Sequence, residues 1–64
     1  MCEARVFVNK NGEMREIMEN VVTVRPDGET LILSDIFGEQ KRIRATLQEV
    51  KLLDHKIILE SDEG

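Results

Sequence analysis

Most of the chain consists of short segments in which apolar and polar residues alternate, as is typical of half-buried β-strands. In the first segment, Cys2 to Val8, the apolar residues Ala4, Val6 and Val8 fall on one face and the polar ones mainly on the other. The run Val21–Arg25 is richest in β-branched residues, which favour strands. The same reasoning predicts further strands at 13–18, 30–34, 41–45, 47–53 and 56–60.

Three short polar segments predict tight turns between consecutive strands. Asn9–Gly12 and Pro26–Glu29 contain the Asn, Pro, Asp and Gly residues that β-turns require. Asp54–His55 is a two-residue break before the last strand. We therefore expect three antiparallel hairpins along the chain.

The segment Glu13–Met18 is ambiguous when it is considered alone. Met14, Ile17 and Met18 are spaced as on one face of a helix. The strong strand before it and the short loop between them favour a second strand, with a short helix as the alternative. Glu19–Asn20 is a polar break consistent with a β-bulge.

Evenly spaced short strands joined by tight turns predict a small all-β domain, an antiparallel SH3-like barrel of six or seven strands. We expect a single domain at residues 1–60 and a flexible acidic tail at 61–64. Phe37 is expected to cover the open end of the core. The residues predicted to share the interior are Val6, Val22, Val24, Leu31, Leu33, Ile43, Val50, Leu52, Ile57 and Leu59.

Composition restricts the function. The 64 residues carry a net charge of −4 and include two Phe but no Trp or Tyr, so nucleic-acid binding is disfavoured. The apolar runs are too short to span a bilayer, and no signal-peptide core is seen. A single cysteine and the lack of targeting signals favour a cytoplasmic location. No catalytic motif is present, so we do not expect an enzyme.

Cys2 is the strongest candidate for a metal ligand. Its thiolate is a soft donor close to the terminal amine. With Met1 retained, the amine, the Cys2 amide and the sulfur would form two chelate rings; with Met1 removed, Cys2 would offer amine and thiolate. Two chains at a two-fold axis would then supply two nitrogens and two sulfurs, a planar set suited to Ni(II) or Cu(II). The alternative is an ordinary terminal thiol.

The other candidates carry weaker signals. His55 is expected to be a solvated turn residue, and Met14 and Met18 are expected to fill the core. Lys41, Arg42, Arg44, Lys51 and Lys56 would form one basic patch if the last three strands were neighbours, which would suit RNA. A solvated outer face, with acidic residues interleaved, is the favoured interpretation of these cations.

The whole chain resembles the CooT family of small nickel-binding proteins. The matching features are the Met1–Cys2 start that leads into a strand, the loop from Leu33 to Glu39, and the closing hairpin that ends at Glu60. The resemblance implies a homodimeric β-protein that binds nickel through the second-position cysteine at the dimer interface. It also implies an accessory role in the maturation of carbon monoxide dehydrogenase, a nickel enzyme.

From the residues and the resemblance together, we predict a homodimer that holds one Ni(II) through Cys2 of both chains. We also expect a partner protein involved in nickel-enzyme maturation. Cys2 is the only residue that maps onto the family's ligand position. The alternative is a small-barrel RNA-binding protein that uses Lys41, Arg42 and Arg44.

Overall fold

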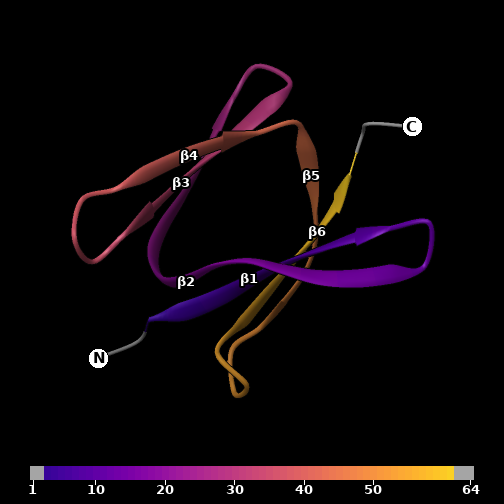
Figure 1. The fold of residues 1–64 in the computed structure, drawn as a ribbon, viewed down its shortest axis with the longest axis horizontal. Helices are drawn as coiled ribbons and strands as arrows, with labels where there is room; N and C mark the ends of the chain where they lie inside the picture. Colours follow the sequence, from indigo (N-terminus) through magenta and orange to yellow (C-terminus); the bar gives the residue numbers. More distant parts are fainter. Residues whose placement is uncertain (1–2, 62–64) are drawn as a thin grey trace.

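The computed structural model describes residues 3–61, and this part of the chain forms six β-strands and no helix. The strands are β1 (Ala4–Lys10), β2 (Glu13–Asp27), β3 (Thr30–Asp35), β4 (Gln40–Ile43), β5 (Ala45–Lys51) and β6 (Lys56–Ser61) (Figure 1). The all-β prediction with six or seven strands is confirmed. Residues 13–18 belong to β2, so the helical alternative is wrong.

The strands form one sheet in the order β4-β3-β2-β1-β6-β5. The three predicted hairpins are confirmed, because β1–β2, β2–β3 and β5–β6 are antiparallel pairs. However, β1 and β6 are parallel, with Val6 opposite Ile57, so the sheet is not purely antiparallel. One side of β1 pairs with β2. On its other side, the start of β1 lies beside the β5–β6 turn, so β6 leaves this turn in the same direction as β1. The Arg5 amide donates to the His55 carbonyl at 2.9 Å there.

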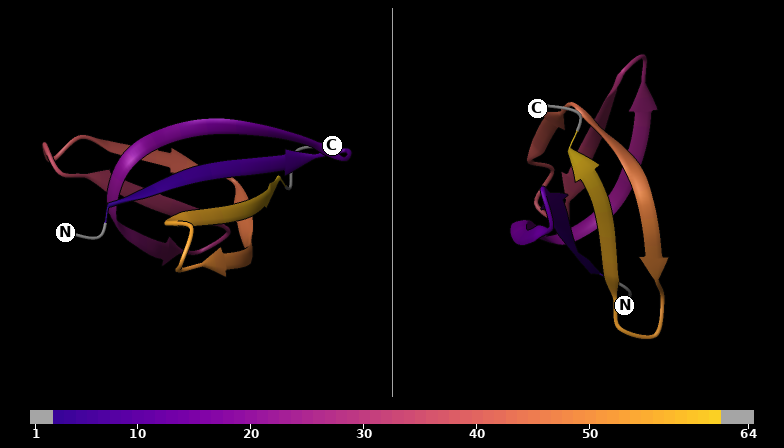
Figure 2. Two further views of the ribbon diagram at one scale, coloured as in Figure 1. Left: turned by 90° about the horizontal axis from the view of Figure 1, so that it is seen from below. Right: turned by 90° about the vertical axis from the view of Figure 1, so that its right-hand side faces the viewer.

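The sheet curls because β2 bends sharply within its length. Asn20 has a φ of 59°, and the register of the β1–β2 pair shifts between Ala4 and Val6, so the predicted bulge at 19–20 is present. The first half of β2 pairs with β1 and the second half with β3, and Figure 2 shows the resulting arch. The curl brings β5 into contact with β3, although these strands are not neighbours in the sheet.

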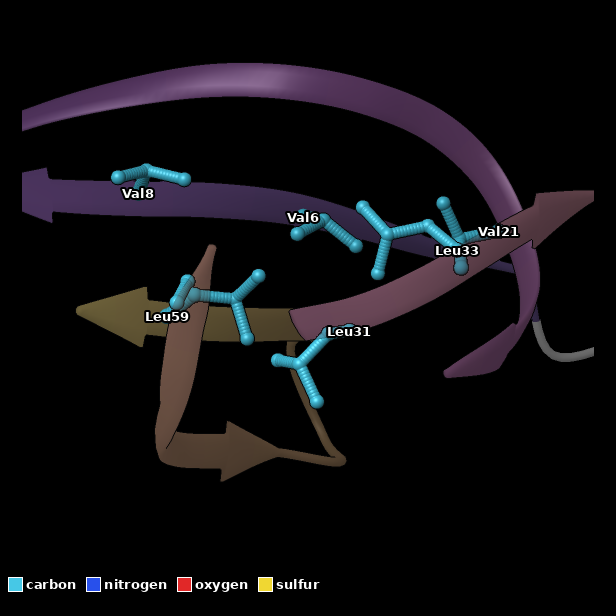
Figure 3. Close-up of a cluster of buried hydrophobic side chains, with 7 residues drawn as sticks. Val6, Val8, Val21, Leu31, Leu33 and Leu59 are labelled. Atoms are coloured by element: carbon cyan, nitrogen blue, oxygen red, sulfur yellow. The ribbon is translucent and has the colours of Figure 1, made fainter. Parts of the chain in front are cut away.

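The concave face of this curled sheet holds the core (Figure 3). Of the predicted interior residues, Val6, Leu31, Leu33 and Leu59 are buried. Three more pack partly buried against them: Val24, Ile43 and Ile57. The buried residues that the prediction omitted are Val8, Val21, Ala45 and Ile58.

Val22 was predicted to be in the interior and is 52% exposed, whereas Val21 is 2% exposed. The cause is a bulge in β2. The β2–β3 register shifts between Val21 and Thr23, so the strict alternation of inward and outward residues is broken there.

Val50 and Leu52 were also predicted to be interior residues, and they are 45% and 80% exposed. Val50 lies on β5, one of the two edge strands of the sheet, so it has a neighbouring strand on one side only. Leu52 lies beyond the end of β5, in the turn where the His55 amide donates to the Leu52 carbonyl at 3.2 Å.

Two further packing predictions are wrong. Phe37 does not cover the core and is 79% exposed. The reason is that the Asp35 carboxylate accepts hydrogen bonds from the Phe37 and Glu39 amides, both at 2.9 Å, and holds the loop away from the interior. Met14 is 50% exposed at the far end of the β1–β2 hairpin, while Met18 packs against the core as expected.

At the end of the chain, β6 extends through Ser61, one residue into the segment that we assigned to the tail. The remainder of that segment, residues 62–64, lies outside the described residues. No helix of residues 3–61 is long and apolar enough to cross a membrane.

Candidate functional site

Cys2, the predicted metal ligand, lies outside the described residues, so the site is considered from the residues that follow it. At the start of β1, Ala4 pairs with Val21 of β2 on one side. On the other side, Arg5 pairs with Lys56 of β6. The chain therefore enters the sheet between the bend of β2 and the β5–β6 turn.

An apolar groove opens at this point. It has a volume of about 410 Å³, and the second half of β2 forms one wall while the β5–β6 hairpin forms the other. Ala4 belongs to its lining, so the groove includes the start of β1. Its lining residues are Ala4, Val21, Val22, Thr23, Val24, Val50, Lys51, Leu52, His55, Lys56 and Ile57.

All three apolar residues that were wrongly predicted to be in the interior line this groove. Val22 stands on the β2 wall, and Val50 and Leu52 stand on the hairpin wall. Leu53, at the tip of the same hairpin, is 96% exposed. Contiguous exposed apolar side chains of this kind mark interaction surfaces in soluble proteins.

A second, more polar hollow adjoins the groove and shares Ala4 and His55 with it. Its acidic lining residues are Glu3, Glu19 and Asp54. Within residues 3–61, none of these three carboxylates takes part in an ion pair. The chain thus enters β1 between the apolar groove and a hollow that is lined by these three carboxylates and by Arg5.

His55 is a turn residue, as predicted, and has a φ of 55°. The sequence did not indicate that this turn lies beside the start of β1, to which it is joined by the Arg5–His55 backbone hydrogen bond. No group of three or more His, Cys, Asp or Glu side chains gathers as a metal site within residues 3–61.

The basic residues considered for RNA binding do not form one patch. Lys41 and Arg42 lie on β4 at one edge of the sheet, whereas Lys51 and Lys56 lie on β5 and β6 at the other. The condition for a single patch, that the last three strands be neighbours, is not met.

The cations near β4 are also engaged within the chain. The Arg42 guanidinium contacts the Asp27 carboxylate at 2.8 Å and the Thr30 hydroxyl at 2.9 Å. Arg44 pairs with Glu29 at 3.1 Å. The Lys41 ammonium donates to the Ile17 carbonyl at 3.3 Å. The ion pairs of Arg42 and Arg44 reduce the positive charge that these two side chains offer to phosphates.

The sequence contained one signal that could have revealed the groove. Leu52 and Leu53 stand side by side directly before the Asp54–His55 turn. Consecutive residues on a strand point to opposite faces, so two adjacent leucines at a hairpin end cannot both be interior. The groove itself, which joins this turn to β2, required the structure.

Comparisons with known proteins identify the family. Residues 1–60 match the family model of the CO dehydrogenase accessory protein CooT. The fold matches the crystal structure of a candidate CooT from Carboxydothermus hydrogenoformans with a TM-score of 0.89 and 35% identity, over 97% of this chain and 100% of that one.

Two archaeal relatives are described as uncharacterized proteins. The one from Archaeoglobus fulgidus is 40% identical over 45 residues, which is 70% of this chain and all of that protein. The one from Methanocaldococcus jannaschii is 32% identical over 60 residues, 94% of this chain and 98% of that protein. With the family model matching nearly the whole chain, this protein belongs to the CooT family of CO dehydrogenase accessory proteins.

Proposed function

We propose that this protein is a cytoplasmic nickel-binding accessory protein that serves the maturation of a nickel enzyme such as carbon monoxide dehydrogenase and catalyses no reaction itself. In this proposal, Ni(II) binds to Cys2 at the interface of a homodimer. The observation that carries it is the family match, which starts at residue 1 and therefore includes Cys2.

The chemistry of Cys2 suits this role. A thiolate with a neighbouring backbone or terminal nitrogen favours a square-planar Ni(II) or Cu(II) site over a tetrahedral one. One chain supplies one thiolate, and a two-fold axis supplies the second without any further residue. Cys2 precedes Ala4 by two residues, and this limits the separation of their Cα atoms to about 7 Å. The metal would therefore be bound near the apolar groove.

The test is a Ni(II) titration of the wild-type chain and of Cys2→Ser, followed by the thiolate-to-nickel charge-transfer absorption. We expect the band in the wild type and its loss in Cys2→Ser. His55→Gln is the matched control, because His55 is the one imidazole close to the start of β1, and it should retain the band. Binding should also weaken as the pH falls, since protons compete for sulfur and nitrogen.

An unchanged nickel affinity in Cys2→Ser would overturn the proposal. So would salt-sensitive RNA binding that depends on Lys41, Arg42 and Arg44 and is indifferent to Cys2. The ion pairs of Arg42 and Arg44 argue against this second outcome.

A further inference from the structure

The first half of β2 has a neighbouring strand on one side only. Residues 13–18 pair with β1, whereas β3 pairs with β2 only from Val21 onward. Within residues 3–61, no strand lies along the other edge of residues 13–20. The Ile17 carbonyl is instead reached from β4, because it accepts a hydrogen bond from the Lys41 ammonium at 3.3 Å. An uncovered edge of this kind carries backbone groups with which another chain can pair.

A hollow of about 510 Å³, here called the edge hollow, lies along this uncovered edge. Residues 16–20 of β2 form one wall, and the β3–β4 loop and the start of β4 form the other. The loop is joined to the bend of β2, since the Ile36 amide donates to the Asn20 carbonyl at 3.0 Å (Figure 1). The edge hollow shares no lining residue with the apolar groove, so the two are separate surfaces.

Phe37 lines the edge hollow and is 79% exposed. The Asp35 carboxylate, which accepts from the Phe37 and Glu39 amides, fixes the loop that carries this ring. The Gly38 amide closes the same loop by donating to the Asp35 carbonyl at 3.1 Å. A ring on a fixed loop loses little conformational freedom when a partner binds, and it buries a large apolar area. Phe37 is therefore suited to anchor a partner.

The edge hollow is acidic. Its carboxylates are those of Glu16, Glu19, Asp35 and Glu39, and Lys41 is the one cation among its lining residues. Glu19 and Glu39 take part in no ion pair within residues 3–61. A cationic partner would be attracted by these two carboxylates, and an anionic partner would be repelled.

We propose that the uncovered edge of β2 binds an extended, basic segment of another protein, which joins the sheet as an additional strand and covers Phe37. A backbone N–H group of the segment replaces the Lys41 ammonium at the Ile17 carbonyl. Every second side chain of the segment lies over the edge hollow, where Lys or Arg meets Glu19 and Glu39. The inference goes beyond the proposed function, since nickel takes no part in this contact.

The experiment selects binders from a phage-displayed library of random peptides of about ten residues, a length that suits a strand. The affinities of the selected peptides are then measured by fluorescence anisotropy. We expect selected sequences in which Lys or Arg alternates with apolar residues. Phe37→Ala and Glu39→Lys should each weaken binding roughly tenfold or more. Lys41→Ala should tighten it, because the edge loses a competing donor and the edge hollow loses its cation.

The matched controls lie on β5, at the far edge of the sheet. Leu47 is 55% exposed and controls for Phe37, and Glu49 forms no ion pair within residues 3–61 and controls for Glu39. Leu47→Ala and Glu49→Lys should keep the wild-type affinity. Cys2→Ser should also bind the peptides as the wild type does, so this inference and the nickel site can fail separately. Circular dichroism checks that each variant is folded.

Backbone methylation of a selected peptide separates strand addition from other kinds of binding. Every second residue of an added strand directs its N–H group towards the neighbouring strand. N-methylation of one alternating set of residues should therefore abolish binding, and methylation of the other set should preserve it. Equal losses from the two sets would overturn the inference. So would selected peptides without excess positive charge, wild-type affinity in Phe37→Ala, or an affinity that does not rise in Lys41→Ala.

Discussion

The two hairpin turns at Pro26–Glu29 and Leu52–His55 are built in opposite ways. The first is polar and is fastened by its own chain: the Thr30 hydroxyl donates to the Asp27 carbonyl at 2.7 Å, and Arg42 of β4 reaches the Asp27 carboxylate at 2.8 Å. The second has two exposed leucines at its tip. Its backbone is closed by one hydrogen bond, from the His55 amide to the Leu52 carbonyl.

The two turns therefore differ in what their side chains contribute to the stability of an isolated chain. The first turn satisfies its polar groups with neighbours that the fold already supplies. The second turn exposes apolar surface to water, which costs free energy for an isolated chain. That free energy is regained when another molecule covers the surface. The first turn therefore stabilises the fold, whereas the two leucines of the second turn leave apolar surface exposed to solvent.

The largest effect is expected on the free energy of unfolding, when an interior leucine is truncated and compared with a truncated leucine of the second turn. Leu33 is fully buried, so Leu33→Ala should lower the free energy of unfolding by about 2–5 kcal/mol. Leu53→Ala should change it by less than about 0.5 kcal/mol when the chain is dilute. Urea unfolding followed by circular dichroism measures both. Losses of similar size in the two variants would contradict this difference between buried and exposed leucines.

A smaller effect is expected from the backbone of the first turn. Gly28 has a φ of +64°, and an added Cβ would meet no atom within 4 Å, so the cost of Gly28→Ala is conformational strain alone. We expect a loss of about 1 kcal/mol in the free energy of unfolding. Gly28→Asn should lose less, since Asn tolerates this conformation better. Equal losses in urea unfolding would show that strain is not the cause.

The smallest expected effect concerns the ion pair that fastens the first turn. The Arg42 and Asp27 side chains are each 55% exposed, so their coupling should be about 0.2–1 kcal/mol. A double-mutant cycle of Arg42→Ala and Asp27→Ala measures it. The coupling should shrink in high salt. A salt-independent coupling would mean that Arg42 acts through packing rather than through charge.

The sequence predicted the strands well because alternation and turn residues are local signals. The hairpins at 9–12 and 26–29 follow from Asn, Pro and Gly, and the bulge at 19–20 follows from two polar residues in a strand-forming region. The parallel pairing of β1 with β6 was missed, because a pairing between the two ends of the chain leaves no local pattern.

The candidate site was predictable only in part. Cys2 stands out by its chemistry, although it lies outside the described residues. The apolar groove was missed because Val22, Val50 and Leu52 were assigned to the interior from hydrophobicity alone. A bulge and an edge strand, which depend on pairing between separate segments, expose Val22 and Val50, whereas a local turn exposes Leu52.

We propose that Cys2 of two chains binds one nickel ion, and native mass spectrometry of a Ni(II) titration can count both the chains and the metal ions. We expect a species of two chains with one nickel for the wild type, and no nickel-bound species for Cys2→Ala. One nickel per monomer, with no dimer mass at any ratio, would contradict the shared site.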